Sequence, residues 1–78
     1  MKSNFACAVN NCTSGLYIVS KCLEINRNNH VIVPSISFAS TANAPRLCGG
    51  KILFCDVDRR SGIITPKLLK ECIEKNKN

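Results

Sequence analysis

Three consecutive small residues, Cys12, Thr13 and Ser14, lie where a short apolar run gives way to a helical pattern. The first turn of a helix leaves backbone N–H groups without partners, at the positive end of the helix dipole. The hydroxyl groups of Thr13 and Ser14 would add two donors, so this junction could bind a phosphate group. The alternative is that Thr13 only caps the helix. The sequence has neither a G-x-x-x-x-G-K nor a G-x-G-x-x-G motif.

An aromatic residue and two aspartates follow the next two apolar runs. Phe38 comes after the β-branched run 31–33, and Asp56 and Asp58 end the apolar run that starts at residue 51. Ligands of open α/β sheets bind beyond the carboxyl ends of the strands, so Phe38 could form one wall for a planar cofactor ring. It could equally be a core residue. The aspartates could contact a ligand, or they could shape the following turn.

The size and charge of the chain restrict its function. Its 78 residues form at most one small domain, and 45% of them are hydrophobic, as in a globular protein. The net charge of +6 comes from dispersed basic residues with few aromatic residues among them, so we expect no nucleic-acid partner. No apolar stretch approaches the roughly 18 residues of a membrane helix, and the N-terminus does not read as a signal peptide.

The chain contains six cysteines, several of them inside apolar runs. A secreted chain of this length would suggest a disulfide scaffold. Here the cysteines take the positions of small core hydrophobes, and no C-x-x-C pair occurs. The single histidine, His30, has no cysteine at zinc-finger spacing. We therefore expect reduced thiols, a cytoplasmic protein, no metal site and no nucleophilic cysteine.

The hydrophobic periodicity predicts a βαβαβα order of elements. Strands are expected at residues 5–9, 31–33 and 51–57, and helices from Thr13, over residues 37–47 and from Thr65-Pro66. Pro45 should kink or shorten the second helix, which Gly49-Gly50 should end. Right-handed crossovers predict a three-stranded parallel sheet. Its edge strands would be apolar and uncovered, which favours a piece of a larger α/β domain.

Taken in order, these segments resemble the N-terminal part of the large domain of the DegT/StrS sugar aminotransferases. These enzymes use pyridoxal 5′-phosphate and share the aspartate aminotransferase-like fold. The family motif A-V-S-S-G-T-A-A-L is similar to residues 8–16, and V-I-V-P-S-x-T-F-x-A-T-A-N is similar to residues 31–43. F-V-D-I-D is similar to residues 54–58, and a family helix start is similar to residues 65–66. The resemblance extends from Phe5 to about Ile73.

The resemblance implies a cofactor site in this chain. Thr13 and the backbone at Cys12 to Ser14 would hold the phosphate of pyridoxal phosphate. Phe38 would stack on the pyridine ring. In the family, the Schiff-base lysine and the aspartate at the pyridinium nitrogen both lie beyond the matched region. Residues 1–78 are therefore expected to be a partial large domain without a second domain or catalytic residues, inactive by itself.

The resemblance also implies the parent reaction. An amino acid, with glutamate as the expected donor, would give its amino group to a nucleotide-linked 4-keto-6-deoxy sugar in cell-surface polysaccharide or glycan biosynthesis. The family implies a homodimer. Two other functions remain open from the residues alone, namely a non-catalytic α/β binding or interaction module and a small basic nucleic-acid-binding protein.

Overall fold

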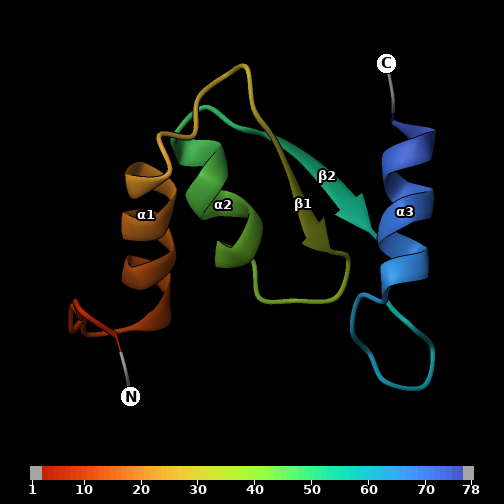
Figure 1. Cartoon of the computed structure of the whole chain (residues 1–78), viewed down its shortest axis with the longest axis horizontal. Helices are drawn as coiled ribbons and strands as arrows, with labels where there is room; N and C mark the ends of the chain where they lie inside the picture. Colours follow the sequence, from red (N-terminus) through yellow and green to blue (C-terminus); the bar gives the residue numbers. More distant parts are fainter. Residues whose placement is uncertain (1–2, 77–78) are drawn as a thin grey trace.

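The computed structural model describes residues 3–76, which form three helices and two strands (Figure 1). The elements are α1 (Cys12–Cys22), β1 (His30–Pro34), α2 (Ser40–Leu47), β2 (Lys51–Cys55) and α3 (Pro66–Lys75). β1 and β2 pair in parallel, with His30 opposite Lys51 and Pro34 opposite Cys55, and α2 connects them. The predicted α/β class is confirmed.

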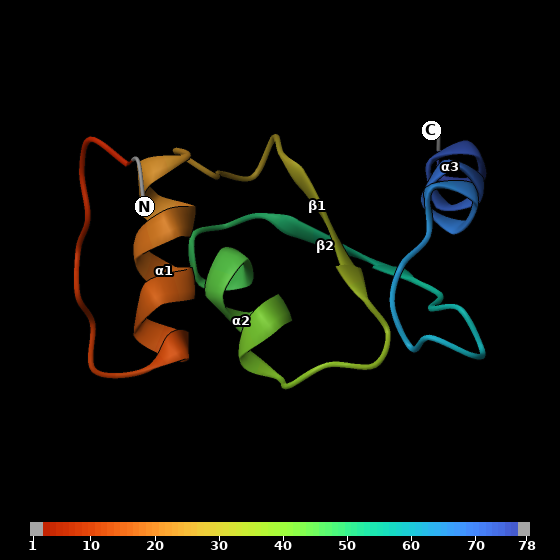
Figure 2. The same ribbon diagram turned by 60° about the horizontal axis from the view of Figure 1, so that its bottom comes forward.

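The predicted first strand is not formed. Residues 5–9 adopt no strand, and Phe5 is 91% exposed. This segment runs along the outer side of α1, away from the sheet (Figure 2), and a Cβ on Gly15 would lie 3.4 Å from Val9 Cγ2. Strands need a neighbour to pair with and elements to cover their faces, and α1 lies between this segment and β1. The predicted three-stranded sheet is therefore corrected to a two-stranded sheet within residues 3–76.

The second helix starts three residues later than the predicted range of 37–47. α2 begins after Ala39, which provides no side-chain cap. Residues 35–39 form a loop instead, in which the Ser37 and Thr41 hydroxyls lie 2.7 Å apart. Pro45 is buried inside the last turn, and its carbonyl accepts hydrogen bonds from the N–H groups of Cys48 (3.1 Å) and Gly50 (3.0 Å).

The other predicted signals match the structure more closely. Gly49 has a φ of 96° and follows α2 as its stop. The Thr65 hydroxyl caps α3 by accepting a hydrogen bond from Leu68 N–H (3.3 Å), and Pro66 is the first helical residue. β2 ends at Cys55, two residues before the predicted end at residue 57.

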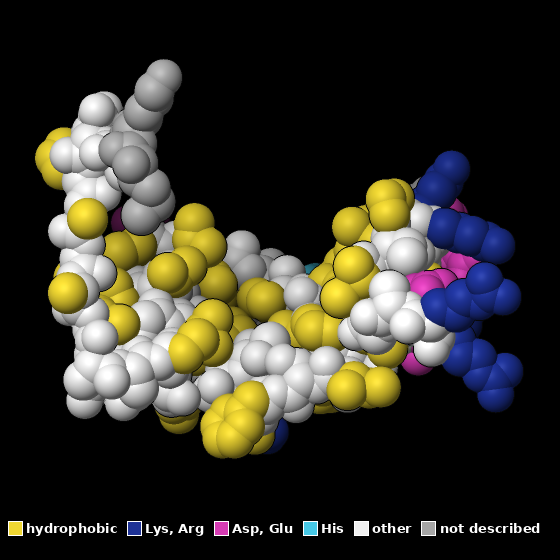
Figure 3. Space-filling model, turned by 90° about the horizontal axis from the view of Figure 1, so that it is seen from below, with side chains coloured by type: hydrophobic (Ala, Val, Ile, Leu, Met, Phe, Trp, Pro, Cys, Tyr) yellow, Lys and Arg dark blue, Asp and Glu magenta, His cyan; other side chains and the backbone are white. Residues whose placement is uncertain are grey.

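The core of the described chain is small. Its buried hydrophobic side chains are Val33, Ala44, Cys55 and Cys72, and Pro45 of α2 is buried as well. The radius of gyration is 13.9 Å, whereas a compact domain of this length would have about 11.5 Å. On the face seen in Figure 3, apolar side chains reach the surface over much of the molecule, while most of the visible Lys and Arg side chains lie at the α3 end. Large apolar areas of the helices and strands are thus left uncovered by this fold.

Candidate cofactor site

A cavity of about 500 Å³ lies between the N-terminal half of α1 and one face of α2, from its first residue to its last. Thr13, Ser14 and Tyr17 of α1 line one side of it, and Phe38 and residues of α2 line the other. Its volume is in the range of small-molecule pockets, about 300–1,000 Å³. Three of the four residues that the sequence predicted for a cofactor therefore border one cavity. The fourth, Cys12, is exposed and is not among the lining residues.

The start of α1 leaves Thr13 available to a ligand. Asn11 is the N-cap, and its Oδ1 accepts a hydrogen bond from Ser14 N–H at 2.8 Å. Thr13 is therefore not the cap, which removes the alternative explanation for this residue. Within the described chain, no group takes up the N–H of Cys12 or Thr13, as is usual in a first helical turn. The Ser14 hydroxyl donates to Asn10 Oδ1 at 3.2 Å.

The N-terminus of α2 adds a second positive helix end. α1 and α2 both begin at the same side of the molecule (Figures 1 and 2). Ser40, the first residue of α2, lines the cavity, and neither helix has an acidic residue in its first turn. Since each helix N-terminus favours negative charge, this end of the cavity suits an anion such as phosphate. α2 is short, so α1 contributes more to this effect.

Phe38 supplies an apolar wall. The residue lies in the loop before α2 and is 77% exposed, so it is not a core residue. It also lines a second cavity of about 190 Å³, beside Pro34 and Phe54. Its carbonyl accepts a hydrogen bond from Thr41 N–H at 3.0 Å, which ties the loop to α2. An exposed ring with space beside it can stack on a planar ligand.

Several lining residues were missed by the sequence reasoning. Tyr17 follows Thr13 by one helical turn, so helical periodicity places it on the same face. Lys21 lies one turn further along, with its Nζ 5.6 Å from the centre of the Tyr17 ring. The α2 lining residues follow helical spacing as well and could have been found in this way: Ser40, Asn43, Ala44 and Leu47.

The two aspartates lie elsewhere, beside a cavity of about 590 Å³ at the carboxyl ends of the strands. Asp58 shapes the following turn, as its Oδ2 accepts hydrogen bonds from the N–H groups of Ser61 (2.9 Å) and Arg60 (3.1 Å). These bonds to Ser61 and Arg60 lower the pKa of the Asp58 carboxyl. Of the two roles that the sequence suggested for the aspartates, Asp58 thus has the turn-forming one, whereas Asp56 is exposed.

The lining of the cavity suits binding rather than proton transfer. Among the residues described, neither a lysine nor a carboxylate borders it. Residues 3–76 also show no cluster of three or more metal-ligating side chains. No helix within that range is long and apolar enough to span a membrane. The hydroxyl groups, free amides and aromatic wall fit a planar ligand that carries a phosphate.

The chain is thus an α/β unit in which α1, α2 and the loop before α2 border one cavity. The family model of the DegT/DnrJ/EryC1/StrS aminotransferase family matches residues 1–78, and the chain belongs to this family. This result agrees with the resemblance seen in the sequence motifs. No solved structure gives a significant match to the chain.

Proposed function

We propose that this chain provides the phosphate-binding and ring-stacking part of a pyridoxal phosphate site in a sugar aminotransferase. One observation carries the proposal: Thr13, Ser14 and Phe38, which come from two separate segments, border the same cavity. Membership in an aminotransferase family supports the reaction class. The substrates would be an amino acid donor, such as glutamate, and a nucleotide-linked 4-keto-6-deoxy sugar used for a surface polysaccharide or glycan.

Each residue has a defined task in this proposal. The N–H groups of Cys12 and Thr13 and the Thr13 hydroxyl donate hydrogen bonds to the cofactor phosphate. The Ser14 hydroxyl, which donates to Asn10 Oδ1 in this structure, would exchange that hydrogen bond for one to the phosphate. Phe38 holds the pyridine ring from one side. When bound, pyridoxal phosphate supplies an electron sink for the amino-acid carbon that reacts. The residues of this chain bind and orient that group.

The proposal places the catalytic lysine and the aspartate at the ring nitrogen outside the described cavity lining. The exposed apolar surface supports a unit that packs within a larger domain and a homodimer. A cytoplasmic location is part of the proposal. By itself, the 78-residue chain should bind pyridoxal phosphate weakly and should not transfer amino groups.

Tyr17 offers a direct test, because it is the only tyrosine, the chain has no tryptophan, and the residue lines the cavity. Pyridoxal phosphate is titrated against its fluorescence, in parallel with pyridoxal. We expect saturable quenching by pyridoxal phosphate, about 10-fold tighter than by pyridoxal because of the charge-assisted phosphate contacts. Equal affinities for the two compounds would rule out the proposed phosphate site.

A second measurement locates the cofactor chemistry. The mixture is reduced with borohydride and the labelled lysines are mapped by mass spectrometry. Scattered labelling of exposed lysines is expected. A stoichiometric adduct on one lysine would overturn the proposal that the covalent lysine lies outside this chain.

A further inference from the structure

Two buried cysteines lie on the two sides of the contact between α3 and β2. Cys55, the last residue of β2, is 1% exposed, and Cys72 in α3 is 7% exposed. The Cys55 thiol lies 3.5 Å from the Leu68 carbonyl of α3, and the Cys72 thiol lies 3.7 Å from the Phe54 carbonyl of β2. Leu68 precedes Cys72 by one helical turn, so both thiols occupy the same side of the interface. Each thiol therefore contacts a backbone carbonyl of the element that contains the other cysteine.

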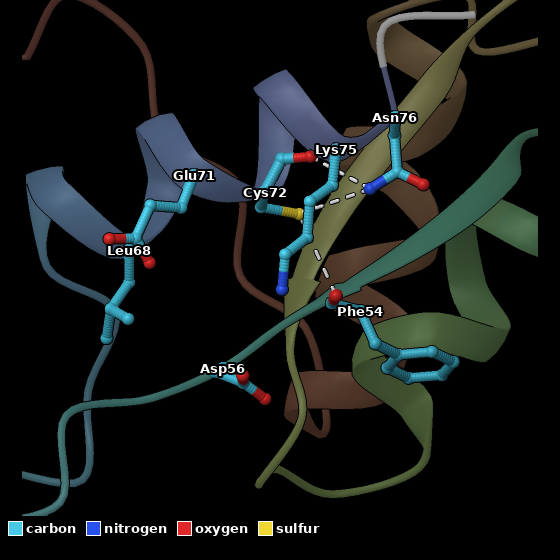
Figure 4. A pocket seen from close by; sticks show the side chains of 7 residues that line it. All are labelled: Phe54, Asp56, Leu68, Glu71, Cys72, Lys75 and Asn76. Atoms are coloured by element: carbon cyan, nitrogen blue, oxygen red, sulfur yellow. Dashed lines mark hydrogen bonds between the residues drawn. The ribbon is translucent and has the colours of Figure 1, made fainter.

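Of the two cysteines, Cys72 borders a cavity and Cys55 does not. Burial raises the pKa of the Cys55 thiol, and the neighbouring Cys72 thiol raises it further through charge and hydrogen bonding. Cys55 is thus a poor initial nucleophile at neutral pH. Cys72 borders a small cavity of about 80 Å³ beside Phe54 and Asn76 (Figure 4). Asn76 Nδ2 lies 3.9 Å from the Cys72 sulfur and 2.8 Å from the Cys72 carbonyl.

We propose that Cys55 and Cys72 form a disulfide by exchange with a small-molecule disulfide such as oxidised glutathione. The Cys72 thiolate attacks one sulfur of the small disulfide and releases one small thiolate, which takes up a proton. The Cys55 thiol then loses its proton, and its sulfur attacks the Cys72 sulfur and displaces the second small thiol. Two protein thiols are oxidised to one disulfide, and one small disulfide is reduced to two thiols. The bond fastens α3 to β2.

The remaining cysteines provide an internal comparison. Cys7, Cys12 and Cys22 are exposed, and Cys48 is half-buried. In the described chain, none of these four has a thiol contact across an interface of the kind that joins Cys55 to α3. They should accumulate mixed disulfides with glutathione, whereas Cys55 and Cys72 should form an internal bond. The experiment therefore measures how much internal Cys55–Cys72 disulfide forms relative to glutathione adducts on the other cysteines.

The test treats the full chain with a graded series of reduced and oxidised glutathione, traps free thiols by alkylation at low pH, and maps tryptic peptides without reduction. We expect a linked pair of peptides that joins Cys55 to Cys72, at least about 10-fold more abundant than in a sample unfolded by guanidinium. Equal abundance in folded and unfolded samples would overturn the proposal. So would a folded sample with glutathione adducts alone.

Two variants test the order of attack and the structural effect. Cys55→Ser should leave a stable glutathione adduct on Cys72, and its absence would contradict Cys72 as the first nucleophile. A variant with serine at the other four cysteines keeps Cys55 and Cys72. Its Tm should rise by on the order of 10 °C on oxidation, and dithiothreitol should reverse this rise. An unchanged Tm would show that the bond does not fasten α3. The peptide map on the unmodified chain stays decisive if a variant does not fold.

Discussion

Thr13 and Phe38 border the same cavity, although one belongs to α1 and the other to the loop before α2. α1 packs against α2, and both helices begin at the same side of the molecule (Figure 2). A hydroxyl at a helix N-terminus thus shares a cavity with an exposed aromatic ring. This pairing is the basis of the proposed cofactor site and yields separate tests for its two parts.

The aromatic part is tested by Phe38→Ala. Loss of the stacking ring should weaken pyridoxal phosphate binding by about 10-fold, because an aromatic contact contributes about 0.5–1.5 kcal/mol beyond its buried area. Inorganic phosphate should bind as before. Tyr17 fluorescence reports both titrations. Phe5→Ala is the matched control, since Phe5 is exposed and does not border the cavity; an equal loss in both variants would contradict the role of Phe38.

The phosphate-binding part of the site is tested by comparing the Thr13→Ala variant with the Asn11→Ala variant. Removal of the Thr13 hydroxyl should weaken phosphate binding by about 10-fold, since a hydrogen bond to a charged group contributes about 1.5–3 kcal/mol. It should change stability little, because Asn11 caps the helix. Asn11→Ala should lower the free energy of unfolding by about 1 kcal/mol. Urea denaturation separates the two effects, and a destabilised Thr13→Ala variant with normal phosphate binding would reverse the assignment.

Gly50 should not tolerate a side chain. A Cβ at this position would lie 2.7 Å from Ile25 Cγ2 and 3.1 Å from the Pro45 carbonyl oxygen. Gly50→Ala should therefore cost about 1–3 kcal/mol in the free energy of unfolding, as overpacking does. The control is Gly62→Ala, where no atom lies within 4 Å but φ is 74°, so only the conformational cost of about 1 kcal/mol applies. A Gly50→Ala variant as stable as the parent chain would contradict the close packing.

Asp58 should make stability depend on pH at the acidic end. Hydrogen bonds from Ser61 and Arg60 lower its pKa in the folded state below the ordinary value of 3.8. Its contribution is complete above the unfolded-state pKa and is lost as the pH falls through the lower, folded-state pKa. Asp58→Asn should remove this part of the acid dependence. An NMR titration of the carboxyl provides the check, and a midpoint at or above 3.8 would refute the turn contacts.

Local patterns predicted most of the elements. The Thr65-Pro66 start of α3 follows from a hydroxyl cap and a proline in the first turn, and both signals are local. β1 and β2 were expected because β-branched and apolar runs alternate with a helix. The start of α2 was placed too early, because Ala39 lacks a capping side chain that would mark the boundary.

Predictions that depend on distant contacts were less complete. Residues 5–9 have the composition of a strand, yet strand formation requires a pairing partner that these residues do not meet. Tyr17 and the α2 lining residues also escaped notice, since periodicity identifies a face without showing what that face will meet.

The sequence by itself determined the starts of α1 and α3 to within one residue, the alternation of β1, α2 and β2, and the candidate residues Thr13, Ser14 and Phe38. Hydrogen bonding and side-chain periodicity within one segment are sufficient for such features. Only the tertiary structure decided that Thr13 is free of a capping role, that the exposed Phe38 borders the same cavity, and that Cys55 and Cys72 are both buried in the contact between α3 and β2. These relations depend on how α1 packs on α2 and α3 on β2, and packing between segments is not encoded in the pattern of either segment alone.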